Sequence, residues 1–202
     1  MLFQPYLEQL QHWPTTGQHI MAQYDADSIY VYQAYKPSIA EYAVAHQAFG
    51  GDFSFGRMSW IKPNFLWMMF RAGWATKEGQ ERILAIRLPR AFFDELLRTA
   101  VASSFAASDC ATEDEWRTQV THSDVRLQWD PDHDPTGRPI ERRAIQLGLR
   151  GRTLERFGRE VLLSVEDITP FVVAQREKAV GDFQGLIVPA EAPYIPSASL
   201  AS

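Results

Sequence analysis

Two short runs of β-branched and aromatic residues, each followed by a proline, constrain the fold of this chain most. Residues 28–35 (SIYVYQAY) precede Pro37, and residues 82–88 (RILAIRL) precede Pro89. Such runs predict strands, and proline fits the first turn of a helix because its missing N–H has no partner there. The sequence therefore predicts a strand followed by a helix, twice, and the first helix should reach to about residue 49.

The second half of the chain adds strand-like runs around an acidic turn. Residues 125–129 and 143–149 predict strands, and the sequence DPDHDPTGRP between them favours a long hairpin loop. A strand at 161–165, a helix from 166 to about 180 and a short helix at 113–119 complete the pattern. Together these runs predict an α+β fold with a mixed, split β-sheet flanked by helices.

Length and composition predict one domain with a tail. The chain has 202 residues, 46% of them hydrophobic and 22% charged, which suits one well-buried core. We assign residues 1–180 to a single domain. Residues 181–202 are rich in Gly, Pro, Ala and Ser and predict an extended or disordered tail, whose deletion should cost less than about 1 kcal/mol.

Charge and targeting signals indicate a cytoplasmic protein. The net charge of −5 argues against general attraction to nucleic acids or acidic membranes, so any anion site must be local. Cys110 is the only cysteine, which excludes a disulfide framework and a cysteine-based zinc site. No secretion signal or membrane-spanning run is recognisable, and no membrane partner is expected.

Residues 57–74 (RMSWIKPNFLWMMFRAGW) are the strongest candidate for a binding site. They hold three of the six tryptophans and three cations. Pro63 predicts a helix start with Lys62 near the N-cap and Arg57 just upstream, where free N–H groups already favour an anion. Gly50, Gly51 and Gly56 before this segment could let backbone amides approach a phosphate, or could simply form a turn.

Helical spacing divides this segment into two faces. The face expected in the core comprises Phe65, Leu66, Met69 and Phe70, and the face expected to bind ligand comprises Trp67, Arg71 and Trp74. Arg71 could stack on an indole while its guanidinium meets an anion. The alternative is that both indoles are core residues and the cations are ordinary solvated charges.

Familiar catalytic and metal motifs are missing. There is no G-x-G-x-x-G, G-x-x-x-x-G-K-[ST], H-E-x-x-H or G-x-S-x-G sequence, and the five histidines have no mutual metal-ligand spacing. The run Asp130, Asp132, Asp134 raises a metal hypothesis, but Pro135 replaces the glycine of a calcium loop. We favour an acidic turn and expect no metal.

The motifs, taken in order, resemble a known family. IYVYQAYKPSIA, RMSWIKPNFLWMMFRAGW with GQERILAI behind it, VRLQWDPDHD and RAIQLGLRG look like the successive motifs of the family called domain of unknown function 4291. The resemblance runs from about Met21 to Phe171, and its Trp-rich motif is highly specific. The family name implies no established activity.

A more distant resemblance concerns the order of the elements, which is similar to the ADP-ribosyltransferase fold. In that fold NAD lies in a cleft between two half-sheets, so the resemblance implies NAD as cofactor. It implies catalytic roles for Tyr32, Gln33 and Gln146, and cofactor contacts for Tyr35, Arg57, Lys62, Trp67 and Arg71. The alternative for the residues on the first strand is routine alternating packing.

The chain departs from those transferases at the catalytic carboxylate. They generally use a Glu to stabilise an oxocarbenium-like transition state, whereas the strand RAIQLGL offers Gln146, with Glu141 upstream as the nearest carboxylate. An amide can bind a ribose but cannot offset developing positive charge.

The predicted function is a nucleotide-binding, ADP-ribosyltransferase-like protein that uses NAD and modifies a protein or a nucleic acid. One alternative is a non-catalytic module that binds a nucleotide or a nucleic-acid end, with a tryptophan stacked on a base. Another is a nucleic-acid-processing enzyme with Lys62 as a nucleophile or phosphate clamp. Lys62 lacks the sequence context of covalent nucleotidyl transfer, which ranks this alternative last.

Overall fold

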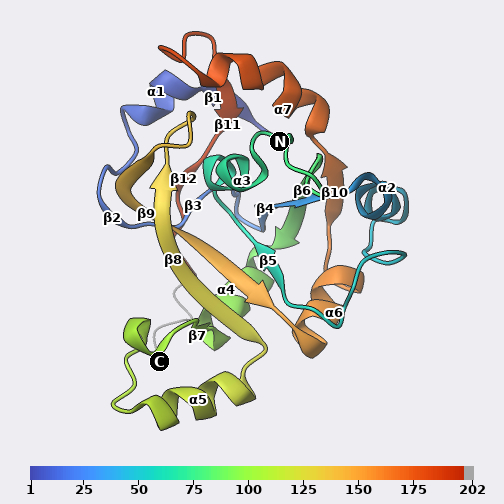
Figure 1. Cartoon of the computed structure of the whole chain (residues 1–202), viewed down its shortest axis with the longest axis vertical. Coiled ribbons are helices and arrows are strands. Elements are labelled where there is room, and N and C mark those ends of the chain that lie inside the picture. Colours follow the sequence, from blue (N-terminus) through green and yellow to red (C-terminus); the bar gives the residue numbers. More distant parts are fainter. Residues whose placement is uncertain (198–202) are drawn as a thin grey trace.

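Two β-sheets that meet at one point organise the chain (Figure 1), whose computed structural model describes residues 1–197. The smaller sheet is antiparallel and has the order β10 (Ser164–Asp167), β6 (Arg82–Pro89), β4 (Ser28–Tyr35). The larger sheet has the order β2 (Gly17–Gln18), β9 (Pro139–Leu149), β8 (Val125–His133), β7 (Val101–Ala102), and β5 (Ser59–Ile61) also pairs with β9. A backbone bridge between Tyr32 and Lys62 joins the two sheets.

The larger sheet is mixed. Its central β8–β9 hairpin and the β5–β9 pair are antiparallel, whereas β2 and β7 pair in parallel at the edges. Two further strand pairs tie the chain ends together: β1 (Phe3–Pro5) with β11 (Ile187–Pro189), and β3 (Met21–Ala22) with β12 (Ala192–Pro193). The result is a single domain of mixed α and β structure, consistent with the predicted α+β class.

Residues 1–197 form seven α-helices, which pack around and between the sheets. They are α1 (Tyr6–Leu10), α2 (Pro37–His46), α3 (Phe65–Ala72), α4 (Arg90–Thr99), α5 (Glu113–His122), α6 (Gly151–Arg159) and α7 (Thr169–Arg176). Figure 1 shows α3 between the two sheets, and it contacts both β4 and β8. Within residues 1–197, none of the helices is both long and apolar enough to cross a membrane.

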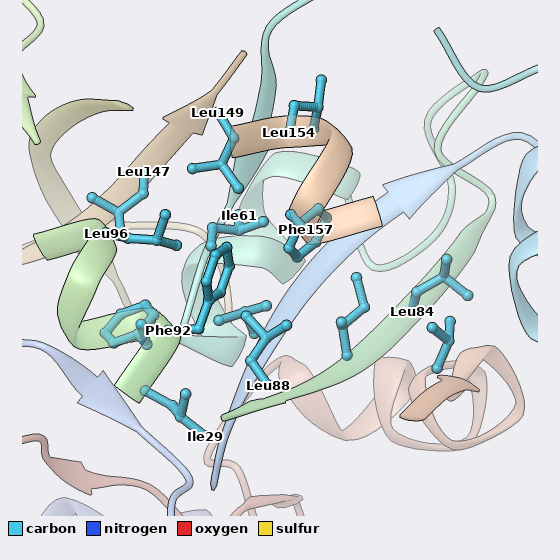
Figure 2. Packing of buried hydrophobic residues seen from close by; sticks show 14 of the residues in the cluster. Ile29, Ile61, Leu84, Leu88, Phe92, Leu96, Leu147, Leu149, Leu154 and Phe157 are labelled. Carbon is cyan, nitrogen blue, oxygen red and sulfur yellow. The ribbon is translucent and has the colours of Figure 1, made fainter. Parts of the chain in front are cut away.

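The centre of the smaller sheet is buried on both faces, which explains the apolar run of residues 83–86 in β6. Leu84, Ile86 and Leu88 face a cluster that also contains residues of α4, α6 and β9, as Figure 2 shows. Ile83 and Ala85 face a second cluster beneath α3. A strand covered on both faces has no polar alternation, so α3 and α4 lie on opposite sides of this sheet.

Several predicted elements are confirmed. The first strand occupies residues 28–35 as expected, and the helices after Pro37 and Pro89 are present. The first ends at His46, earlier than the expected residue 49, and the second ends at Thr99. The predicted strand at 161–165 and helix at 166–180 are shifted to β10 and α7. The helix α6 was missed because its sequence GRTLERFGR buries only Leu154, Phe157 and Gly158.

The C-terminal segment packs against the domain. Strands β11 and β12 lie within the stretch expected to be an extended or disordered tail, and Leu186, Val188, Glu191 and Tyr194 are buried there. The Tyr194 hydroxyl donates to Asp94 Oδ1 over 2.6 Å, and the Trp13 indole N–H donates to the Glu191 carbonyl oxygen over 2.8 Å. Residues 187–194 thus take part in the packing of the domain, so we expect their deletion to cost more than the composition of this stretch suggests; residues 198–202 lie outside the described part.

Candidate functional site

The polar residues of the larger sheet converge on a cleft of about 400 Å³ beside α3. Its lining comes from β5 and the residue after it, from α3, and from the β8–β9 hairpin. The lining residues are Trp60, Lys62, Trp67, Arg71, Gln128, Asp130 and Gln146. Four of these seven, Lys62, Trp67, Arg71 and Gln146, belong to the site predicted from the sequence.

Strand alternation and register explain why these side chains share one face. Gln128 lies opposite Gln146 in the β8–β9 pair, and Trp60 lies opposite Gly148 in the β5–β9 pair. Asp130 lies two residues beyond Gln128, so its side chain points to the same side of the sheet.

Gly148 makes room for the wall of the cleft. A Cβ atom at this position would lie 2.7 Å from Met58 Sδ and 3.0 Å from the Trp60 ring. The absence of a side chain lets the Trp60 indole lie close against β9. We expect Gly148→Ala to displace Trp60 and to change the tryptophan emission spectrum, whereas Gly56→Ala, where a Cβ would meet only Ser54 Oγ at 3.8 Å, serves as the control. Unchanged emission in Gly148→Ala would contradict this packing.

The Asp130 side chain places a carboxylate in the cleft, and two hydrogen bonds hold this carboxylate in a fixed orientation. The Gln128 amide donates to Asp130 Oδ1 over 2.7 Å, and the Gln146 amide donates to Asp130 Oδ2 over 2.7 Å. Two amide donors fix the orientation of the carboxylate without neutralising its charge. Gln146 therefore helps to fix the position of the Asp130 carboxylate.

Lys62 lies at the inner end of the cleft with only 5% of its surface exposed. Its backbone N–H and carbonyl both bond Tyr32, over 3.2 and 2.7 Å, which fixes its position at the junction of the sheets. Burial and then the Arg71 guanidinium lower the pKa of the Lys62 amine to about 7, while Asp130 opposes the shift. A substantial share of this amine is therefore neutral near pH 7.

The Lys62 amine is also free of internal partners. Within residues 1–197 its nitrogen makes no hydrogen bond and no ion pair, although it is almost fully buried. Buried polar groups in proteins are normally hydrogen-bonded, and exceptions concentrate at functional sites. Lys62 is therefore available to a ligand.

Trp67 forms the second aromatic wall. Its ring stacks on the His133 imidazole with 5.2 Å between centroids, and His133 in turn stacks on Phe70 at 3.6 Å. The Trp67 indole nitrogen is buried and has no hydrogen-bond partner among the described residues. Arg71 is exposed, and within this part of the chain it makes no cation–π contact, so the predicted stacking on an indole is not observed.

The start of α3 differs from the prediction. The N-cap is Asn64, whose side chain accepts from the Trp67 N–H, and Lys62 lies two residues earlier. The Phe65 N–H donates to Glu191 Oε1 over 2.7 Å, so a carboxyl group from the C-terminal segment occupies the helix N-terminus. The predicted anion site at this terminus is therefore filled by the chain itself, and an external anion would have to bind at Arg71 and Lys62.

Burial raises the pKa of the Glu191 carboxyl to about 8. The folded state then binds more protons than the unfolded state between the ordinary value of 4.5 and about 8, so stability should fall as pH rises through this window. We expect Glu191→Gln to reduce this dependence in thermal melts, and Glu160→Gln, at an exposed carboxyl, to leave it unchanged. Identical pH profiles for wild type and Glu191→Gln would contradict this role.

The remaining predicted residues lie elsewhere. The Tyr32 ring is fully buried beneath α3, 5.6 Å from the Phe65 ring centroid, and its hydroxyl has no partner in residues 1–197. The Gln33 amide donates to Ser59 Oγ over 2.8 Å and does not line the cleft. Tyr35 and Arg57 line a separate hollow of about 410 Å³ next to Ser59, on the opposite side of β5 from Trp60.

Trp74 and Asp132 are both buried. Trp74 is a core residue whose indole N–H donates to the Pro135 carbonyl over 3.0 Å, so its assignment to the binding face is wrong. Asp132 is fully buried and pairs with Arg142 at 2.6 Å. In the described part of the chain, no three His, Cys, Asp or Glu side chains are grouped to hold a metal ion.

Sequence reasoning missed Asp130 and Gln128 as site residues. The run of three aspartates was interpreted as a turn, although Asp130 and Asp132 belong to β8. Alternation along β8 could have placed Gln128 and Asp130 on one face, but their proximity to Gln146 depends on a hairpin register that a β-bulge shifts between Pro131 and His133.

The fold and the cleft define a single mixed α/β domain with a charged, aromatic-walled site between its larger sheet and α3. The chain belongs to the family described as Domain of unknown function (DUF4291), whose model matches residues 19–194. All seven cleft residues and Glu191 fall within the matched range. No curated protein matches the chain. The family resemblance is thus confirmed, and the similarity to ADP-ribosyltransferases stays a prediction.

Proposed function

We propose that the cleft binds a nucleotide such as NAD or ADP-ribose, and that the protein is an ADP-ribosyltransferase-like enzyme. The observation that carries this proposal is the meeting of a cation, a fixed carboxylate and two indoles in one cleft: Arg71, Asp130, Trp60 and Trp67. The cleft is lined by the larger sheet and α3, and its Lys62 lies at the backbone bridge to Tyr32, where the two sheets meet.

Each group matches one part of a dinucleotide. The exposed guanidinium of Arg71 suits a pyrophosphate, because arginine stays protonated and can donate two parallel hydrogen bonds. An indole offers a flat surface on which a base or a nicotinamide ring can stack. The Lys62 amine, which lines the cleft, and the Trp67 nitrogen, which has no partner among the described residues, are donors that a ligand can satisfy.

Gln146 carries a neutral amide, so the carboxylate of the cleft comes from Asp130. In glycosidic cleavage of NAD the bond from C1′ to the nicotinamide nitrogen breaks, nicotinamide leaves with the electron pair, and positive charge develops on the ribose. A carboxylate already oriented by two amide donors stabilises that charge without reorganising. An acceptor nucleophile on a protein or nucleic acid then bonds to C1′ and loses its proton.

Binding is the first test of this proposal. In calorimetry with NAD, ADP-ribose and ATP, we expect Arg71→Ala to weaken affinity by about tenfold to a hundredfold, as for the loss of a charge-assisted contact. The exposed Arg152 serves as the control, and Arg152→Ala should match the wild type. A larger loss of affinity in Arg57→Ala than in Arg71→Ala would place the ligand in the hollow beside Tyr35 and Arg57. Absence of binding by the wild type would refute the proposal.

A second candidate is a non-catalytic module that binds a nucleotide or a nucleic-acid end. The aromatic walls favour it, since stacking on Trp60 or Trp67 tolerates any base. Nicotinamide release distinguishes the two, because only the enzyme cleaves NAD.

A further inference from the structure

The Lys62 amine stands out among the cationic side chains of the protein. It is almost fully buried, it lines the cleft, and within residues 1–197 no carboxylate pairs with it. By contrast Lys36 pairs with Asp52 at 2.7 Å, and Lys77 donates to the Arg71 carbonyl over 2.7 Å at the surface. A buried lysine used only for phosphate binding would gain from staying charged, whereas burial here favours the neutral, nucleophilic form.

We propose that Lys62 is a nucleophile that forms a Schiff base with the aldehyde carbon of a phosphorylated sugar, such as the open-chain form of ADP-ribose. The choice of ADP-ribose as the sugar rests on the proposed function. The reaction requires an amine, an anion contact, a group that moves protons, and walls that limit water, and the cleft contains all four.

Arg71 and Asp130 provide the two charged groups that face Lys62. Arg71 lies on α3 and offers the anion contact, and Asp130 lies on β8 and faces the amine from the sheet. A phosphate bound at Arg71 would offset its effect on Lys62, but burial is the largest cause of the lowered pKa and would remain. The amine thus stays reactive in the presence of an anionic substrate.

Lys62 and Asp130 together account for every proton that moves in this reaction. The neutral Lys62 amine bonds to the aldehyde carbon, and Asp130 takes a proton from nitrogen and returns it to oxygen, which gives a carbinolamine. Asp130 next delivers the second nitrogen proton to the carbinolamine hydroxyl, and the carbon–oxygen bond breaks as water leaves, so that amine plus aldehyde yields imine plus water. The indoles of Trp60 and Trp67 restrict solvent around the imine, which slows its hydrolysis.

The test traps the imine in the intact protein. We would incubate the wild type with ADP-ribose, or with ribose 5-phosphate, in the presence of cyanoborohydride, which delivers hydride to the imine carbon and leaves a stable secondary amine. Peptide mass spectrometry then locates the adduct. We expect Lys62 to be labelled at least tenfold faster than the exposed Lys178 near neutral pH, with a rate that saturates in sugar and levels off above the Lys62 pKa of about 7.

Two variants and a parallel binding measurement separate the outcomes. Lys62→Arg keeps a cation and Lys62→Met keeps the length, and both should lose the adduct while labelling of Lys178 persists. Equal labelling of all lysines, or no label on Lys62 from either sugar, overturns the inference. If ADP-ribose still binds in that case, the proposed function survives; if ribose 5-phosphate labels Lys62 but no nucleotide binds, the inference stands and the proposed function fails.

Discussion

Deletion of residues 187–202 is expected to lower the free energy of unfolding by more than about 5 kcal/mol, enough to prevent folding of many domains. The deletion removes the partner strands of β1 and β3, the buried side chains of Val188 and Tyr194, and the carboxyl group at the start of α3. For a chain of this size each kcal/mol shifts the thermal midpoint by about 2 to 4 °C, so the midpoint should fall by more than about 10 °C. Calorimetric melting measures it.

A matched pair of substitutions tests the same claim without truncation. Val188 is 1% exposed and Val180 is 65% exposed. We expect Val188→Ala to cost about 2 kcal/mol through the cavity it leaves, and Val180→Ala to cost less than about 0.5 kcal/mol. Equal melting of the two variants, or a truncated protein that melts like the wild type, would show that the segment does not stabilise the core.

The second large effect concerns catalysis. If Asp130 stabilises the oxocarbenium-like transition state, Asp130→Asn should lower the rate of nicotinamide release from NAD by about a hundredfold to a thousandfold. Affinity for NAD should change little, since a contact made only in the transition state affects turnover more than binding. Asp114→Asn, at an exposed carboxyl of α5, serves as the control. Chromatographic assay of nicotinamide with protein, RNA and DNA acceptors provides the measurement.

Gln146 gives an independent check on the role of Asp130. Gln146→Ala removes one of the two amides that hold the carboxylate, so we expect partial loss of turnover. Gln146→Glu places a second carboxyl group against Asp130, where one of the two should hold a proton. Nicotinamide release at the background level for the wild type and every variant would leave the non-catalytic binding module as the better account.

Local patterns in the sequence were sufficient for much of the fold. The strand at 28–35 and the helix starts at Pro37 and after Pro89 follow from residue composition and from the geometry of proline. The spacing of residues 57–74 was also sufficient to single out Lys62, Trp67 and Arg71, which line one cleft. Each of these features depends on residues close together in the chain.

Features that depend on distant contacts were not predictable in this way. Glu191 meets Phe65 across 126 positions of sequence, and no local pattern indicates that a carboxyl group in a Pro- and Ala-rich segment would cap α3. Trp74 has the spacing of the binding face but adopts a positive φ of 52° beyond the helix end, which turns its indole into the core. To predict that Asp130 lies beside Gln146, one needs the register of the β8–β9 hairpin, which alternation alone does not fix.

The central claim is that the cleft between Trp60, Trp67, Lys62 and Arg71 is the ligand site. Crystals of the protein grown with ADP-ribose test it most directly. The account predicts density in this cleft, with a phosphate on Arg71, a ring against one of the two indoles and the ribose beside Asp130. Density in the hollow beside Tyr35 and Arg57, or an empty cleft at saturating ADP-ribose, would contradict it.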